Sequence, residues 1–239
     1  MKAQQTGTLH LIPVGLSDQT IDCWLPGAAA HKAGQLAYYI AENAKTARAF
    51  LKLLELAQPI QAIHIETLTA KTDDATIKNW LAPLQNGHDV GLVSEAGCPA
   101  VADPGARVVA LAHASGLPVK PWVGPSSIML GLMASGLDGQ RFAFHGYAPI
   151  KADERSRQLK QWEQLSKRLS QTQILIETPY RNEAMFETLT HTLAPSTRLC
   201  IARDLTGQKE WIRTLPIAQW KKAEKPQLDQ LPTLFLFQA

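Results

Sequence analysis

The chain has 239 residues, of which 45% are apolar and 19% are charged, with 15 glycines and 15 prolines. This composition is typical of a globular protein with one large or two small domains, and it excludes a collagen-like fibre or a disordered tail. No apolar run approaches the roughly 18 residues that a membrane span needs, and residues 1–10 lack the apolar core of a signal peptide. We therefore expect a cytoplasmic protein without membrane contact.

The three cysteines are far apart and odd in number, which predicts reduced thiols and excludes a disulfide framework or a CxxC-type site. The seven histidines include neither an HExxH motif nor a cluster with metal-ligand spacing, so no metal is expected. Charge is unevenly spread. Residues 1–150 carry 10 basic against 11 acidic side chains, whereas residues 151–239 carry 14 against 10. This asymmetry is weak evidence for an anionic partner.

The first half of the chain alternates short apolar runs with longer stretches of helical spacing. Residues 8–14, 36–41, 62–65, 89–93 and 117–121 are expected strands, and residues 43–56, 74–85 and 105–115 are expected helices. Strands joined by crossover helices predict an α/β fold with a parallel sheet covered on both faces. In such a sheet the ligand crevice lies at the carboxyl ends of the strands.

A second domain is expected to follow the segment 121–125, PWVGP, whose two prolines and glycine are typical of a linker. The predicted domains are therefore residues 1–121 and 122–239. The second is expected to contain a helix at 126–135, an exposed charged helix at 151–168, and strands at 141–145, 173–177, 198–203, 209–214 and 233–237.

Residues 92–105, LVSEAGCPAVADPG, are the most informative stretch. A buried strand ends at Val93, a loop of small residues follows, and Asp103-Pro104-Gly105 has the N-cap and first-turn chemistry of a new helix. Gly97 lacks a Cβ, so a ligand can approach the exposed backbone N–H groups there. A tight turn without a ligand explains this loop equally well.

Two further loops have similar character: residues 11–17, LIPVGLS, where the first strand ends, and residues 123–127, VGPSS. The two hydroxyls and the free N–H groups of a helix start at VGPSS suit a carboxylate or a ribose hydroxyl. Together the three loops favour a cofactor site. A P-loop, a GxGxxG dinucleotide motif and a GxSxG nucleophile elbow are all absent from the sequence.

These loops resemble those of the tetrapyrrole methylase family of S-adenosylmethionine-dependent methyltransferases, and more narrowly its branch that methylates a cytidine ribose 2′-hydroxyl in small-subunit ribosomal RNA. That branch has the pattern S-D-A-G-T-P-x-x-x-D-P-G, matched at residues 94–105 with Glu95 for Asp and Cys98 for Thr. Its P-G-P-x-S/A, Y-E-S-P-H-R and A-R-E-L-T elements are similar to residues 123–127, 176–181 and 202–206. The resemblance extends over nearly the whole chain.

The resemblance implies two α/β domains with the methyl donor S-adenosylmethionine in the cleft between them, usually in a homodimer. Carried over by position, the donor should contact a set of loop residues: Pro13, Val14, Gly15, Gly97, Cys98, Val101, Ser126, Ser127, Glu177, and the segment 231–232 with Pro232. Two loops depart from the branch. Its P-x-G-N-L-x-D-I-T and A-E-D-T-R patterns become residues 13–21 and 41–45, without the Asn and with Asn43 replacing the acid. These departures leave the acceptor open.

Methyl transfer from a sulfonium to a hydroxyl is an in-line displacement that also needs a proton acceptor. Three glutamates at or after predicted strand ends are candidates, Glu95, Glu42 and Glu177, with Glu95 placed first because it lies in the signature loop. For each of them a role in orienting backbone or pairing an arginine is the alternative.

If ribosomal RNA or the small ribosomal subunit is the partner, phosphate contacts are expected from Lys151, Arg155, Arg157, Lys160, Arg181 and Arg203. Core packing and base stacking explain Tyr147 and Tyr180 equally well. The alternatives to RNA methylation are a tetrapyrrole-type methylase acting on a small molecule and a donor-binding protein with diverged acceptor specificity.

Overall fold

The computed structural model describes residues 6–228 and 230–239. Residues 1–5, part of the segment in which no signal peptide is expected, lie outside the described residues. The chain divides into two units, Met1–Ser126 and Ser127–Ala239, whereas the predicted boundary followed Pro121. No helix among the described residues is long and apolar enough to cross a membrane.

The first unit is built on a parallel sheet with the strand order β3-β2-β4-β1-β5. Each strand overlaps a predicted one, and β1 and β5 are much shorter than expected. The strands are β1 (Leu9–Leu11), β2 (Tyr38–Ala41), β3 (His64–Thr67), β4 (Val90–Val93) and β5 (Val119–Pro121). Strand β4 is buried throughout because it lies at the centre of the sheet.

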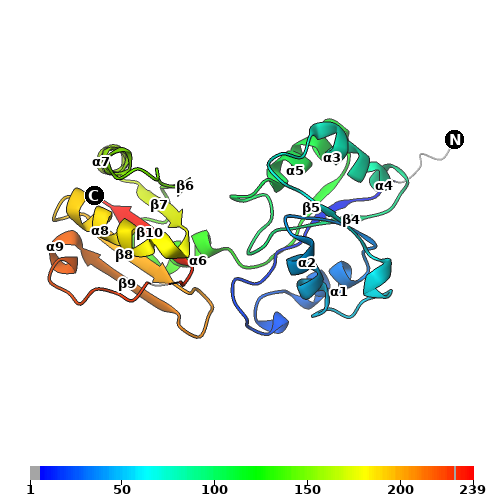
Figure 1. The fold of residues 1–239 in the computed structure, drawn as a ribbon, viewed down its shortest axis with the longest axis horizontal. Coiled ribbons are helices and arrows are strands. Elements are labelled where there is room, and N and C mark those ends of the chain that lie inside the picture. Colours follow the sequence, from blue (N-terminus) through cyan, green and yellow to red (C-terminus); the bar gives the residue numbers. More distant parts are fainter. Residues whose placement is uncertain (1–5, 229) are drawn as a thin grey trace. The chain divides into compact units, whose positions relative to one another are not determined.

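Helices cover both faces of this sheet, which matches the expected α/β arrangement (Figure 1). One apolar cluster joins one face to α1 (Gly27–Gly34) and α2 (Ala44–Leu51). A second cluster joins the other face to α3 (Asp74–Trp80), α4 (Ala82–Gln85) and α5 (Gly105–Ala114). Two short 3-10 turns complete the unit, η1 (Ile21–Cys23) and η2 (Ile60–Ala62).

The helices differ from the sequence expectation in three places. Helix α1 was not predicted, because its alanine-rich sequence has no apolar periodicity of its own. The helix predicted at 74–85 is two helices that meet at Leu81, since Pro83 lacks the N–H that a continuous helix requires. Helix α2 ends at Leu51 and not at residue 56. It begins after Asn43, whose side chain accepts the Lys45 N–H as an N-cap.

Gly91 of β4 makes room for the largest buried side chain of the first unit, Tyr39 of β2. The two residues are partners in the ladder, and a Cβ added at Gly91 would lie 2.5 Å from Tyr39 Cε1. The Tyr39 hydroxyl donates a 2.6 Å hydrogen bond to the Ala33 carbonyl and so ties β2 to α1. Burial raises the pKa of this phenol, which stays protonated. Tertiary packing of this kind holds α1 in place.

The second unit has a mixed sheet with the strand order β6-β7-β10-β8-β9. Only β6 and β7 run parallel, and the remaining neighbours are antiparallel. The strands are β6 (Phe142–Tyr147), β7 (Thr172–Glu177), β8 (Arg198–Arg203), β9 (Trp211–Pro216) and β10 (Thr233–Gln238). All overlap predicted strands, and the sequence had left the mixed pairing undetermined.

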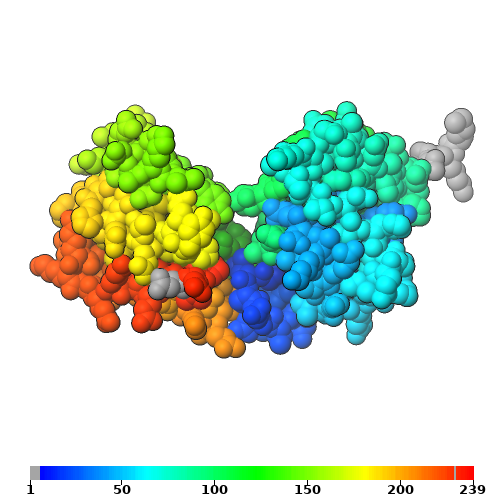
Figure 2. Space-filling view, viewed as in Figure 1, coloured from blue at the N-terminus to red at the C-terminus, as the bar shows by residue number. Residues whose placement is uncertain are grey.

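Four helices cover this second sheet (Figure 1). Helix α6 (Ser127–Ser135) packs in one apolar cluster, while α7 (Ala152–Leu169), α8 (Asn182–Thr192) and α9 (Ile217–Trp220) pack in another. The sequence analysis expected α7 to be exposed. Figure 2 shows this yellow-green segment at the surface, yet its inner face buries Arg155, Leu159 and Trp162. Helices α8 and α9 and the 3-10 turn η3 (Pro179–Arg181) were not predicted.

Replacing Gly91 with alanine is expected to destabilise the first unit by about 1–3 kcal/mol, because the added methyl overpacks the Tyr39 ring. The measurement is the free energy of unfolding from urea denaturation. Gly27→Ala is the control: nothing lies within 4 Å of a Cβ at this first position of α1, so stability should stay equal or rise. Equal stability of the wild type and the Gly91 variant would contradict this packing.

Candidate functional site

The carboxyl ends of the five parallel strands lie at one edge of the first sheet, because every strand runs in the same direction. The candidate site is formed by the segments that follow the strands. In sheet order they are residues 68–70 after β3, Glu42 after β2, residues 94–98 after β4, residues 12–15 after β1 and residues 122–126 after β5.

The three loops predicted to bind the methyl donor, residues 11–17, 92–105 and 123–127, are called the donor loops below. A pair of backbone hydrogen bonds joins the first two of them. The Val14 N–H donates to the Gly97 carbonyl at 3.0 Å, and the Gly97 N–H donates to the Val14 carbonyl at 3.1 Å. Gly97 has a φ of +72°, a conformation that favours glycine. A Cβ there would lie 3.3 Å from Leu16 Cδ2 and 3.5 Å from the Pro125 carbonyl oxygen. Leu16 and Pro125 therefore pack against the side of Gly97 where a Cβ would lie.

The third predicted loop packs against the first two. The Cys98 thiol donates a hydrogen bond of 3.3 Å to the Pro125 carbonyl, and burial raises the pKa of this thiol. Gly124 lies directly over the Pro13 ring, so closely that no side chain fits between them. The structure thus brings together Pro13, Val14 and Gly15 with Gly97 and Cys98 and with the segment that leads to Ser126.

Backbone donors remain available at this junction. In the part of the chain that the structure describes, the N–H groups of Gly15, Ala96 and Cys98 donate to no protein acceptor. Such groups suit a carboxylate or a ribose hydroxyl of a ligand. These N–H groups therefore fit S-adenosylmethionine, which carries both a carboxylate and ribose hydroxyls.

The loop from Cys98 to Gly105 has an unusual backbone. Ala100 and Ala102 have φ values of +68° and +63°, and Val101 between them is 48% exposed. Asp103 holds this loop, since its Oδ1 accepts the Ala100 N–H at 3.0 Å and the Gly105 N–H at 2.6 Å. Helix α5 begins at Gly105, as the sequence predicts, and Pro104 is its N-cap residue. Left-handed alanines are strained, and strain of this kind clusters at functional sites.

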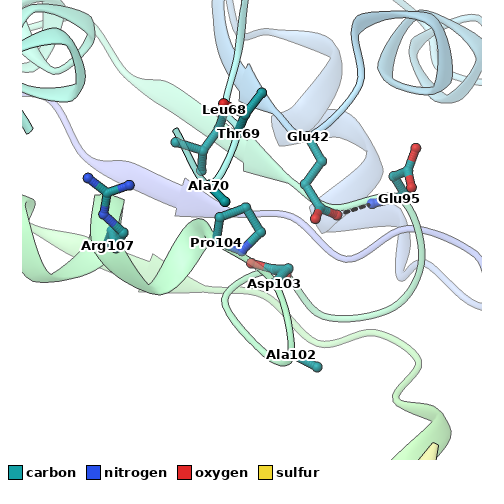
Figure 3. A pocket seen from close by; sticks show the side chains of 9 residues that line it. All are labelled: Glu42, Leu68, Thr69, Ala70, Glu95, Ala102, Asp103, Pro104 and Arg107. Atoms are coloured by element: carbon teal, nitrogen blue, oxygen red, sulfur yellow. Dashed lines mark hydrogen bonds between the residues drawn. The ribbon is translucent and has the colours of Figure 1, made fainter. Parts of the chain in front are cut away.

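Next to this junction lies a pocket of about 730 Å³ at the carboxyl ends of β2, β3 and β4. Figure 3 shows the side chains that line it, which are Glu42, Leu68, Thr69, Ala70, Glu95, Ala102, Asp103, Pro104 and Arg107. Three of these are acidic, and the Arg107 guanidinium forms an ion pair with Asp74 at 2.6 Å. A phosphate would therefore be repelled from this pocket, whereas hydroxyl or amino groups would find acceptors.

Glu42 and Glu95 differ sharply in their surroundings. The Glu42 carboxylate accepts the backbone N–H of Glu95 at 3.0 Å, while the Glu95 carboxylate is turned away from Glu42 (Figure 3). Burial raises the pKa of Glu42, and the nearby Asp103 and Glu95 carboxylates add to this effect. Burial also raises the pKa of Asp103. The signature loop thus acts on Glu42 in two ways. The Glu95 N–H donates a hydrogen bond to its carboxylate, and the nearby Asp103 carboxylate disfavours its ionisation.

The remaining predicted site residues lie in the second unit. Ser127 begins α6, Glu177 ends β7, and Pro232 precedes β10. Glu177 is paired in the sheet with Thr233, the residue after Pro232, so the structure brings these two calls together. The buried Glu177 carboxylate lies 2.7 Å from the Arg181 guanidinium in an ion pair. Arginine pairing, the alternative role considered for Glu177, is what this contact shows.

Three of the six residues predicted to contact phosphate are bonded to other groups of the second unit. The buried Arg155 donates to Thr188 and to the Ile150 carbonyl, Arg181 pairs with Glu177, and Arg203 donates to two backbone carbonyls. The other three are exposed: Lys151 at the N-cap of α7, and Arg157 and Lys160 on the helix. Lys151 pairs with Glu154 at 3.2 Å, and Arg157 donates to the Asp153 carbonyl at 3.4 Å, both at the surface.

Both tyrosines near the motifs are exposed, Tyr147 by 57% and Tyr180 by 79%. Core packing, one of the two readings left open, therefore does not explain their positions. In residues 6–228 and 230–239, no group of three or more histidine, cysteine or acidic side chains could hold a metal ion.

The sequence analysis did not find the pocket residues Leu68–Ala70 and Arg107. A signal for Arg107 existed, since it stands four residues after Asp103 in the first turns of α5. The residues that follow β3 carry no motif, and only the strand order places them beside Glu42.

Comparison with curated proteins gives similar chains with one name. "Ribosomal RNA small subunit methyltransferase I" of Pseudomonas aeruginosa is 35% identical over 140 residues, covering 59% of this chain and 48% of the relative. Proteins of the same name from Escherichia coli O157:H7 and Synechocystis are 33% and 31% identical over 148 and 180 residues. These matches cover 61% and 74% of this chain, and 50% and 61% of the relatives. The matched region thus spans about half the length of these relatives, and no protein-family model matches the chain.

Comparison with solved structures identifies the fold. The methyltransferase CobJ has a TM-score of 0.62 with 14% identity, over 98% of this chain and 93% of the other. The cobalamin biosynthetic enzyme cobalt precorrin-4 methyltransferase, CbiF, has a TM-score of 0.61 with 12% identity, over 97% and 94%. The predicted fold class, two α/β units of the tetrapyrrole methylase type, is confirmed. The resemblance to the ribosomal RNA branch is confirmed by the names of the relatives.

Replacing Glu42 with glutamine is expected to stabilise the protein at pH 7 and to have no such effect at low pH. The raised pKa means that the folded state holds the Glu42 proton more tightly than the unfolded state. Wild-type stability therefore falls as the pH rises and Glu42 ionises. The glutamine amide oxygen can still accept the Glu95 N–H, and it carries no charge at any pH. The measurement is urea denaturation of both proteins between pH 4 and pH 8. A variant less stable than the wild type at pH 7 would contradict the assignment.

Proposed function

We propose that the chain is an S-adenosylmethionine-dependent methyltransferase that acts on a hydroxyl group of ribosomal RNA in the small subunit. The observation that carries the proposal is the convergence of the three donor loops at the carboxyl edge of the first sheet, with unpaired N–H donors on Gly15, Ala96 and Cys98. The similarity to proteins named ribosomal RNA small subunit methyltransferase I supports the RNA acceptor.

In this proposal the donor loops hold S-adenosylmethionine, which supplies an electrophilic methyl carbon bonded to a positively charged sulfur. In the first unit it would be held by Pro13, Val14, Gly15, Gly97, Cys98, Val101 and Ser126. The resemblance also assigns Ser127, Glu177 and Pro232 to donor binding. The protein then works by positioning, because in-line transfer needs no covalent intermediate with the enzyme.

A ribose hydroxyl must lose its proton as the methyl group arrives. Glu95 stood first among the candidate bases in the sequence analysis. Both glutamates line the pocket. The geometry favours Glu42, because the Glu95 N–H holds its carboxylate in place and because burial and two acidic neighbours raise its pKa. In this assignment Glu95 orients Glu42 through its backbone N–H.

The acidic pocket also bears on the acceptor. Carboxylates accept hydrogen bonds from hydroxyl or amino groups and repel phosphate or carboxylate groups. An RNA acceptor would therefore place a nucleoside in the pocket and its phosphates elsewhere, with Lys151, Arg157 and Lys160 as exposed partners. A small carboxylate-rich acceptor, the second candidate, suits this pocket less well. Homodimeric assembly, which the resemblance implies, and the cytoplasmic location that the sequence analysis expects belong to the same proposal.

The direct test combines binding and transfer. Calorimetry is expected to give a dissociation constant for S-adenosylmethionine well below 1 mM, equivalent to more than about 4 kcal/mol. Incubation with small ribosomal subunits and labelled donor should place the methyl group on a ribose of the RNA, identified by nucleoside mass spectrometry. RNA binding should weaken steeply with salt. Donor binding without RNA methylation, together with salt-insensitive binding of a small acceptor, would favour the second candidate.

Variants separate the two glutamates. Glu42→Gln is expected to lower kcat by about 100-fold or more, the usual contribution of a general base, while Glu95→Gln should cost less than about tenfold. The Glu95 variant is the matched control, since it keeps the backbone N–H on which Glu42 depends. Calorimetry should show equal donor affinity for both variants. A larger loss of kcat in Glu95→Gln would return the role to Glu95.

A further inference from the structure

His10 lies on β1, between β4 and β5 in the first sheet, and only 4% of its surface is exposed. Its Nδ1 atom lies 3.0 Å from the indole Nε1 of Trp122. An indole N–H can only donate, so the imidazole must accept at Nδ1 and carry its proton on Nε2. The neutral imidazole is therefore the form that makes this hydrogen bond.

The charges around His10 come from three other elements. Asp89, just before β4, places Oδ2 at 3.3 Å from His10 Nε2, and Lys32 of α1 is ion-paired with the same carboxylate. Lys120 of β5, the neighbour of His10 in the sheet, places its ammonium over the Trp122 ring. Burial, with the charge of Lys32 next, lowers the pKa of His10, and Asp89 opposes this effect.

Trp122 is the first residue of the segment that leaves β5. Its backbone N–H donates to the Leu11 carbonyl at 3.1 Å, and its ring packs on the apolar cluster of α1 and α2. Immediately after it, Gly124 packs on Pro13 and the Pro125 carbonyl accepts the Cys98 thiol. The position of Trp122 thus sets the start of the segment that closes the donor-loop junction. Nothing in the sequence analysis singled out His10 or Trp122 for this role.

We propose that His10 is a positioning residue whose neutral imidazole anchors Trp122 and with it the segment 122–126, so that its protonation releases this segment and weakens donor binding. The imidazolium has no acceptor at Nδ1, and the indole N–H would then face a second N–H. The effect on donor binding rests on the proposed function, whereas the anchoring of Trp122 does not.

The sign of the pH dependence follows from the direction of the shift. The folded protein binds the His10 proton more weakly than the unfolded chain, so the stabilising contribution is complete above pH 6.5 and is lost as the pH falls below that value. Donor affinity should fall over the same range.

The first readout is NMR of the 15N-labelled full chain between pH 5 and pH 8. The indole N–H resonance of Trp122, assigned through Trp122→Phe, should shift with a midpoint below pH 6.5. His10→Asn should abolish this shift, because the amide oxygen can replace Nδ1 as acceptor and does not titrate. His113→Asn, an exposed histidine on α5, is the matched control and should leave the shift unchanged.

The second readout is calorimetry with S-adenosylmethionine at pH 8 and pH 5.5. Wild-type affinity should fall about fivefold or more at the lower pH, and the fall should be reduced in His10→Asn and retained in His113→Asn. An assigned Trp122 indole resonance that stays invariant with pH in the otherwise unaltered protein would overturn the anchor. A titrating indole with pH-independent donor affinity would overturn the link to binding. Absent donor binding at every pH, with the indole titration intact, would overturn that link and the proposed function while supporting the anchor.

Discussion

The paired hydrogen bonds between Val14 and Gly97 are the constraint on which the rest of the candidate site depends. They fix the end of β1 against the loop after β4, two segments that lie more than eighty residues apart in sequence. The bond pair requires the positive φ of Gly97, and the close packing of Gly124 on Pro13 then brings in the segment after β5. Three loops of small residues become one surface because glycine permits both the backbone angle and the close approach.

The neighbouring loop combines strain with support. Two alanines in the left-handed region cost free energy, and Asp103 offsets part of this cost by accepting two backbone N–H groups. The same side chain stands beside Glu42 and disfavours its ionisation. The half-buried Asp103 carboxylate thus shapes the loop and adds to the effect of burial on the pKa of Glu42. This coupling of backbone geometry to electrostatics is typical of active sites.

The two units differ in their charge. The first unit combines a near-neutral balance with an acidic pocket, which suits the uncharged part of an acceptor. The second unit holds the excess of basic residues, yet some of its arginines bind neighbouring groups within the unit. Arg155 and Arg181 are tied down by neighbours, so the surface charge open to an anionic partner is smaller than the count of side chains implies.

The sequence by itself determined the α/β class, the approximate positions of the strands in the described residues, and the three loops that were singled out as candidates for the site, because apolar period, turn residues and the signature motif are local properties. It did not determine α1, which depends on Tyr39 and the space at Gly91, nor the mixed pairing around β10. Only the tertiary structure decided that Glu42 faces the pocket while Glu95 contributes its backbone, and that His10 meets Trp122. Those relations join residues from different strands, and the strand order that brings them together is set by packing and not by any local pattern.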